Sequence, residues 1–91
     1  MFNLGRTKEA IESYQEGLKI DPEQASILCN LGYALHKLEK KEEAKENYKK
    51  SMKINPQKPE PYLMLGVISN EQGQKKEALD FLNKAVKLDP R

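Results

Sequence analysis

The residues that could form a catalytic or metal site are few. His36 is the only histidine and Cys29 the only cysteine. They are seven residues apart, which places both on the same side of a helix. A metal site needs three or four ligands, and a nucleophilic cysteine needs a partnered base; neither set is completed nearby. We therefore expect no catalytic residue, no metal and no cofactor, and predict that the chain is not an enzyme.

The charged residues give no other functional signature. The carboxylate pairs Glu42 with Glu43 and Glu9 with Glu12 have lysines nearby, which indicates a solvated surface and not an acid–base pair. A glycine-rich phosphate loop is absent. Four lysines recur at helical spacing, but glutamates alternate with them and no aromatic platform accompanies them: Lys41, Lys45, Lys49 and Lys53. Sixteen basic and fourteen acidic residues leave a net charge of only +2. We predict no binding to nucleic acid or to a membrane.

Composition indicates one small, helix-rich domain with a solvated surface, because 37% of its 91 residues are apolar and 33% are charged. No apolar run approaches the roughly 18 residues that span a bilayer, and the start is too short and too polar for a secretion signal. A single cysteine excludes an internal disulfide and is compatible with a reducing compartment. We expect a cytoplasmic protein.

Apolar residues at spacings of three, four and seven predict a chain of helices. Gly5 is placed to end a first helix, whose beginning is absent, and Thr7 to cap the next one. The run Asp21-Pro22-Glu23-Gln24 resembles a capped helix start, and Gly73 is placed to close a helix. The expected helices span about 7–20, 23–37, 42–54, 59–72 and 75–88.

A register of 34 residues connects these helices. Pro22, Pro56 and Pro90 are each separated by 34 positions. The same step relates further columns of identical or similar residues: Ala10, Ala44 and Ala78; Glu9, Glu43 and Glu77; Lys19, Lys53 and Lys87; Ile20, Ile54 and Leu88; Gly32 and Gly66. So many coincident columns predict a tandem array in which each helix pair buries its apolar face against the next. Gly17, Gly32 and Gly66 are expected to allow close approach of neighbouring helices.

The columns together resemble the tetratricopeptide repeat. One copy reads Leu28-x-x-Leu31-Gly32-x-x-Leu35, then Ala44-x-x-x-Tyr48, then Pro56, and a second reads Tyr62-x-x-Leu65-Gly66-x-x-Ser69, then Ala78-x-x-x-Leu82, then Pro90. Ser69 departs from the pattern, and we expect weaker packing there. The resemblance implies an all-α solenoid of antiparallel helix pairs, a right-handed superhelix of about five helices. Residues 1–91 would form one module: a partial repeat at 1–22, a complete repeat at 25–58, and a repeat at 59–91 that lacks its last residue.

The resemblance also implies a function and a site. Members of the family are non-catalytic scaffolds that hold a partner peptide or helix in a concave groove lined by the first helix of each pair. The corresponding residues of the first complete repeat are Ser26, Cys29, Asn30, Tyr33, His36 and Lys37, and those of the second are Glu60, Leu63, Met64, Val67, Asn70 and Glu71. Leu63, Met64 and Val67 are apolar, which favours a binding groove over a purely solvated face.

Two specialised forms of the family fit less well. Those that clamp a terminal carboxylate use lysine, arginine and asparagine on successive first helices. Asn30 matches one such position, but Glu60 and Met64 stand where basic residues belong. A ladder of asparagines, as in sugar transferases, is interrupted by Met64 after Asn30. We therefore interpret Asn30 as structural.

The ends of the array suggest an alternative function. A partner helix is expected to be missing beside Ala10, Tyr14 and Leu18 at the start, and beside three apolar residues at the end: Leu79, Leu82 and Val86. Either the chain is part of a longer array, or copies associate through these ends as a homo-oligomer by head-to-tail stacking or helix exchange.

Overall fold

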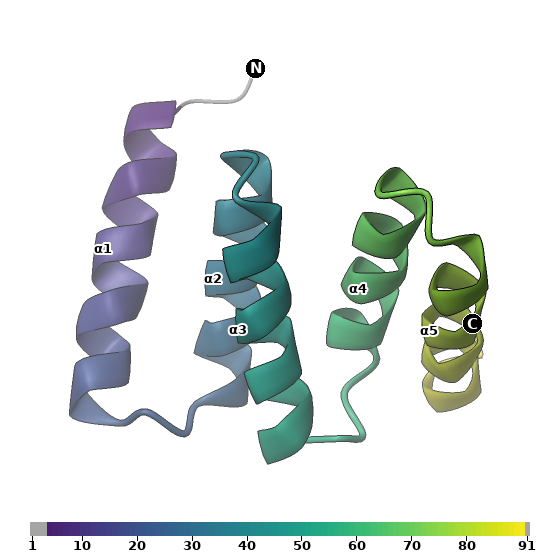
Figure 1. Ribbon diagram of the computed structural model, residues 1–91. Coiled ribbons are helices and arrows are strands. Elements are labelled where there is room, and N and C mark those ends of the chain that lie inside the picture. The colour runs from purple at the N-terminus through teal and green to yellow at the C-terminus, as the bar shows by residue number, and fades with distance from the viewer. Residues whose placement is uncertain (1–3, 91) are drawn as a thin grey trace.

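The computed structural model describes residues 4–90, which fold into five helices that follow one another across the molecule in alternating directions (Figure 1). Their bounds are α1 Leu4–Ile20, α2 Ala25–Lys37, α3 Lys41–Ile54, α4 Pro59–Glu71 and α5 Lys75–Leu88. No strand occurs within residues 4–90. The predicted all-α array of helix pairs is confirmed, and the last four helices begin and end within two residues of their expected bounds. None of the helices in this range is both long and apolar enough to cross a membrane.

The start of the chain differs from the prediction. Gly5 and Thr7 both lie inside α1, so no helix ends at the first and none begins at the second. Glycine weakens a helix by only about 1 kcal/mol relative to alanine, so its presence alone does not require a break. Thr7 is buried and lies in the first turn of a helix that already begins at Leu4, so it does not hold the predicted N-cap position. The expected helix end at 1–3 lies outside the described residues.

The connection between α1 and α2 also uses its residues differently than predicted. The carboxylate of Asp21 accepts a hydrogen bond from the backbone N–H of Glu23 (3.1 Å), and α2 begins only at Ala25, without a side-chain cap. The amide of Gln24 points backward and donates to the carbonyl oxygens of Gly17 and Asp21, each at 3.0 Å. Gln24 therefore caps the end of α1 instead of completing a capping box for α2.

The turns inside the two complete repeats occupy equivalent positions. Glu39 and Gly73 are 34 residues apart, and both have a positive φ, of 64° and 77° respectively. Glycine takes this left-handed backbone without a steric penalty, whereas a residue with a Cβ does not. Gly73 therefore ends α4 as predicted, and the same turn after α2 is made by a strained glutamate.

The core lies where α2, α3 and α4 meet. Its buried residues are Cys29, Leu31, Leu35, Ala44, Tyr48, Leu65 and Ile68. A Cβ on Gly32 would lie 2.9 Å from the Tyr48 ring, and one on Gly66 would lie 2.7 Å from the Leu82 side chain. These distances confirm that the two glycines let a large side chain of the second helix lie against the first. Ser69 is fully buried, and its hydroxyl donates to the Glu77 carboxylate at 3.3 Å.

Candidate functional site

A hollow of about 360 Å³ lies between α2 and α4, on the side that the sequence predicts to be a groove. Both helices are the first of their pair, so the repeat itself sets them side by side. The lining residues are Tyr33, His36, Lys37 and Glu39 from α2 and the turn after it, and Met64, Val67 and Glu71 from α4. We call this surface the α2–α4 groove.

The α2–α4 groove has an apolar part made by Tyr33, Met64 and Val67. Tyr33 keeps 48% of its surface exposed, and the other two are partly buried. The Lys37 ammonium lies 5.0 Å from the centre of the Tyr33 ring, within the range of a cation–π interaction. A flat aromatic ring beside two flexible apolar side chains can hold an apolar side chain of a ligand with little loss of conformational entropy.

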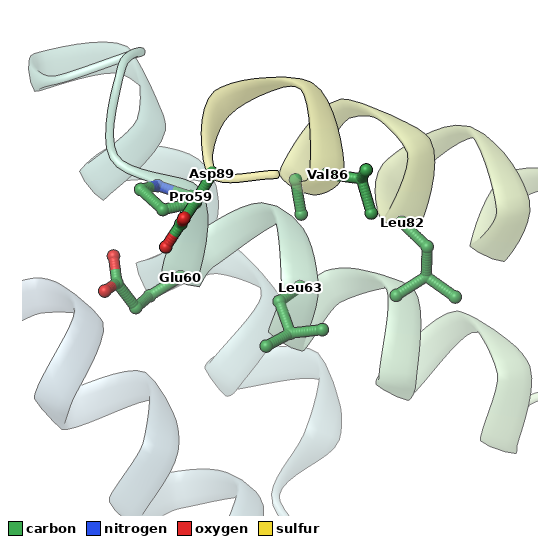
Figure 2. A pocket seen from close by; sticks show the side chains of 7 residues that line it. Pro59, Glu60, Leu63, Leu82, Val86 and Asp89 are labelled. Carbon is green, nitrogen blue, oxygen red and sulfur yellow. The ribbon is translucent and has the colours of Figure 1, made fainter. Parts of the chain in front are cut away.

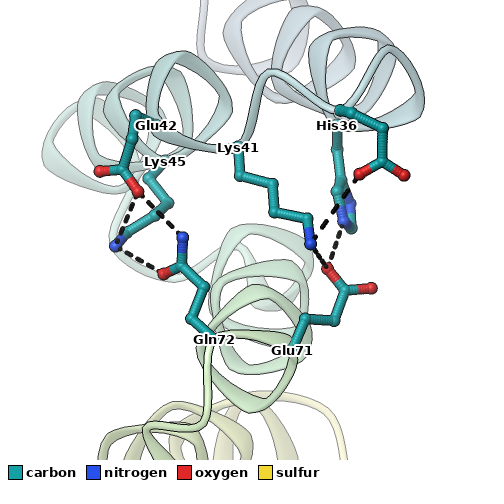
Figure 3. Close-up of polar contacts among 7 residues, drawn as sticks. His36, Lys41, Glu42, Lys45, Glu71 and Gln72 are labelled. Carbon is teal, nitrogen blue, oxygen red and sulfur yellow. Dashed lines mark hydrogen bonds and ion pairs between the residues drawn. The ribbon is translucent and has the colours of Figure 1, made fainter.

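A polar bridge between the two repeats forms one wall of the groove (Figure 3). His36 Nε2 and Glu71 Oε1 are 2.9 Å apart, and Lys41 Nζ lies 3.5 Å from the same oxygen. The hydrogen bond from His36 is the main cause that holds the pKa of Glu71 below its ordinary value, and Lys41 adds to the effect. The Glu71 carboxylate is therefore held in place by His36 and Lys41, and it keeps the His36 and Glu71 side chains of the groove wall together.

Gln72 makes a second bridge beside the first one (Figure 3). Its side-chain oxygen accepts a hydrogen bond from Lys45 Nζ at 3.1 Å, and its amide nitrogen donates to Glu42 Oε2 at 2.9 Å. Glu71 and Gln72 therefore both fasten the end of α4 to the preceding repeat, and together they fix the separation of the two helices that line the groove.

Six of the twelve predicted groove residues line this hollow. Ser26, Asn30 and Asn70 are exposed but lie outside its lining. Cys29 was wrongly placed in the groove: it is only 8% exposed and belongs to the core cluster with α4 residues Leu65 and Ile68. Burial is the main cause that raises the pKa of its thiol.

Glu60 and Leu63 line a different hollow, of about 260 Å³, that lies between α4 and α5 (Figure 2). Helical spacing places Glu60 and Leu63 on the same side of α4 as Val67, which is why the sequence predicts them in the groove. Spacing alone does not show whether that side of α4 faces α2 or α5. Sequence reasoning did not assign two residues to this region: Glu39, in the turn after α2, and Lys41, which begins α3 and contacts Glu71. The only sequence feature that could have indicated these two residues is their position close to the end of a helix that lines the groove, and this feature is weak.

The two ends of the module are unlike each other. Ala10, Tyr14 and Leu18 were expected to be open, but all three are partly buried, and Tyr14 and Leu18 pack against the core cluster. The outer surface of α1 is polar and includes Glu12, Ser13, Gln15, Glu16 and Lys19. At the other end, Leu79 and Val86 are 60% and 59% exposed, and Leu82 lines the hollow between α4 and α5.

Metal-binding side chains do not gather in the part of the chain that the structure describes: no three histidine, cysteine, aspartate or glutamate residues within 4–90 form such a group. His36 lies at the groove wall and Cys29 in the core, so the two do not form one site.

Three family models match the chain. One described as TPR repeat matches residues 1–39, and two described as tetratricopeptide repeat match residues 25–58 and 59–91. No curated protein matches it.

Several solved structures share the fold. "Crystal structure of MamA" superposes with a TM-score of 0.88 at 22% identity and covers 93% of this chain and 50% of that one. The second and first TPR of Spaghetti (RPAP3), each bound to HSP90 peptide SRMEEVD, give TM-scores of 0.87 and 0.90 at 24% and 23% identity. They cover 93% and 96% of this chain and 79% and 69% of those chains. The chain thus spans half the length of the MamA chain.

Proposed function

The chain belongs to the tetratricopeptide repeat family, and from this premise we propose that it is a non-catalytic interaction scaffold whose α2–α4 groove binds a segment of a partner protein. The observation that carries the proposal is the apolar patch of Tyr33, Met64 and Val67, which lies in a hollow between two first helices that polar bridges hold at a fixed separation. Apolar side chains that gather in a hollow, with polar residues around them, are typical of a surface that binds another protein.

The groove also indicates the chemistry of its ligand. Its charged residues are of both signs, with Lys37 against Glu39 and Glu71, so the electrostatic field does not select a strongly charged segment. The ligand that fits is an extended segment or a helix with at least one large apolar side chain, which would contact Tyr33 and Val67. Cys29 is a free thiol and so is compatible with a reducing compartment, and we propose that the protein acts in the cytoplasm.

The acidic peptide in the Spaghetti structures is not the ligand we propose here. A peptide such as SRMEEVD ends in carboxylates, and the family members that bind such tails use basic residues at the positions that Glu60 and Met64 occupy in this chain. Met64 lines the groove and offers no positive charge to a carboxylate, and Glu60 lies outside the groove and is paired with Lys58 at 4.0 Å. We therefore expect SRMEEVD to bind much more weakly than a neutral apolar peptide.

A peptide-display selection against the immobilised chain would test the groove. Selected peptides are expected to bind about tenfold more weakly to Val67→Glu, because an apolar side chain of the ligand would then have to displace the water around a carboxylate. Binding is measured by fluorescence anisotropy, with SRMEEVD as a second probe. Leu79→Glu, which makes the same chemical change at an exposed site outside the groove, should leave the affinity unchanged. Equal binding to Val67→Glu and wild type, or a selection that yields no peptide, would refute the proposal.

A further inference from the structure

The last two helices present an apolar face that the rest of the described chain leaves open. Its hollow is lined by Pro59, Glu60 and Leu63 from α4, by Leu82, Ala85 and Val86 from α5, and by Asp89 just after α5 (Figure 2). Leu63 is 46% exposed and Val86 59%, and Leu79 lies one turn before Leu82 on α5 and is 60% exposed. We call these residues the α5 face.

The preceding repeat shows which kind of element packs against an equivalent face. At the positions 34 residues earlier, Cys29 corresponds to Leu63, Tyr48 to Leu82 and Met52 to Val86. Cys29 and Tyr48 are 8% and 0% exposed, and Met52 packs against the core cluster, in which α4 residues take part. A helix that runs antiparallel to α3 thus covers that face (Figure 1). The α5 face has the same construction and is shaped for a helix that runs antiparallel to α5.

The N-terminal end of another copy does not supply that helix. The outer surface of α1 carries polar and charged side chains, so stacking it on the α5 face would bury charge against leucine and valine without compensation. This disfavours head-to-tail stacking, which joins the two different ends.

The α5 face is complementary to itself. Along α5 the order is Lys76, Leu79, Leu82, Val86 and Asp89, so that a base precedes the exposed leucine by three residues and an acid follows the exposed valine by three. Reversing the direction of the helix therefore exchanges Leu79 with Val86 and Lys76 with Asp89. Glu60 lines the hollow beside Asp89, and its carboxylate lies 4.0 Å from Lys58 Nζ, so these three residues leave that end of the face with a net negative charge. Lys75 makes the other end more basic.

We propose that the α5 face binds a second copy of this chain, with the two α5 helices antiparallel about a two-fold axis between them. In this arrangement Leu79 of one copy lies opposite Val86 of the partner copy, and the basic end of each face meets the acidic end of the other. Such an isologous contact closes on itself and yields a dimer and not a fibre. The contact uses neither Tyr33 nor Val67, so the groove stays open in the dimer. The proposal of a dimer is therefore independent of the peptide binding proposed above.

Sedimentation velocity of the intact chain over a wide range of concentration would test the contact. Wild type is expected to shift from monomer to dimer and no further. Leu79→Glu should weaken dimerisation by about tenfold or more, because it places a carboxylate, which must lose its water, among the apolar side chains of the contact. Leu79 is exposed in the monomer, so circular dichroism should show an unchanged helix content. Ile20→Glu is the matched control: Ile20 is 87% exposed on α1, and its substitution should leave the dimer unchanged.

Charge reversal would test the antiparallel register. Glu60→Lys alone, or Lys75→Glu together with Lys76→Glu, places like charges opposite each other and should weaken self-association. An equimolar mixture of the two variants should restore it, because each then offers the other an end of opposite charge. A monomer at all concentrations, assemblies that grow beyond a dimer, an equal effect of Ile20→Glu, or a mixture no stronger than its components would overturn the proposal.

Discussion

Single residues decide how closely the helices of a pair approach. Tyr48 is fully buried, and its ring occupies the space that the missing side chain of Gly32 leaves on α2. Its hydroxyl lowers the stability of the fold, because it is buried and has no hydrogen-bond partner among residues 4–90. Burial also raises its pKa, since a phenolate would lose its hydration there. The ring therefore stabilises the pair, and the hydroxyl opposes it.

The first prediction follows from this conflict. Tyr48→Phe should raise the free energy of unfolding by about 1 kcal/mol, since it keeps the ring and removes an unsatisfied polar group. Urea denaturation measures the change. Tyr62→Phe is the matched control: the Tyr62 hydroxyl donates to the Pro56 carbonyl at 3.1 Å, and its removal should lower stability by about 1 kcal/mol. A loss of stability in Tyr48→Phe would show that its hydroxyl is hydrogen-bonded in solution.

At the scale of the element, polar bridges attach the end of α4 to the preceding repeat. Glu71 contacts His36 on α2 and Lys41 on α3, so one carboxylate joins three helices (Figure 3). Its side chain is 40% exposed, and solvent screening therefore limits the contribution of the pair. Because the pKa of Glu71 in the folded state lies below its ordinary value, the carboxylate form stabilises the fold. This stabilisation is fully present above the unfolded pKa and is lost as the pH falls through the folded one.

Glu71→Gln tests that bridge. At neutral pH the variant should be less stable than wild type by about 0.5 kcal/mol. The difference should shrink as the pH falls below the ordinary carboxyl value of 4.5, because the wild-type carboxylate then becomes protonated as well. Denaturation at several pH values measures both effects. Glu12→Gln, on the polar outer surface of α1, should show neither. A difference that is constant with pH would mean that packing and not charge is responsible.

The same scale shows what the sequence could and could not predict. The 34-residue register located the helices and the close contacts at Gly32 and Gly66, because these follow from side-chain size at fixed spacing. Helix capping was predicted less well. The Gln24 side chain lies between α1 and α2 and can hydrogen-bond to the backbone of either helix, and the local sequence does not favour one over the other. Cys29 and Leu63 occupy the same position in successive repeats, yet one is buried and the other is open. Their environments depend on whether another helix follows, which no pattern within one repeat reveals.

At the scale of the whole molecule, the most deeply buried part of the structure is the middle of the array and not either end. The buried core cluster is drawn from α2, α3 and α4, and α1 and α5 add only partly buried residues such as Ile11 and Phe81. In repeat proteins stability is close to a sum over neighbouring interfaces, so an outer helix with one neighbour can open while the centre stays folded. We therefore expect the fold to be most stable behind the α2–α4 groove and less stable at the two outer helices, α1 and α5.

Hydrogen exchange measures this gradient. In dilute solution we expect the slowest amide exchange in α2, α3 and α4, and faster exchange in α1 and α5, because opening an outer helix exposes less apolar surface than opening the centre. Raising the protein concentration should slow exchange in α5 and leave α1 unchanged if copies pair through the α5 face, since binding stabilises only the helix that it covers. Equal protection of all five helices in dilute solution would contradict the gradient, because it would mean that the interfaces unfold together and that no end of this array opens alone.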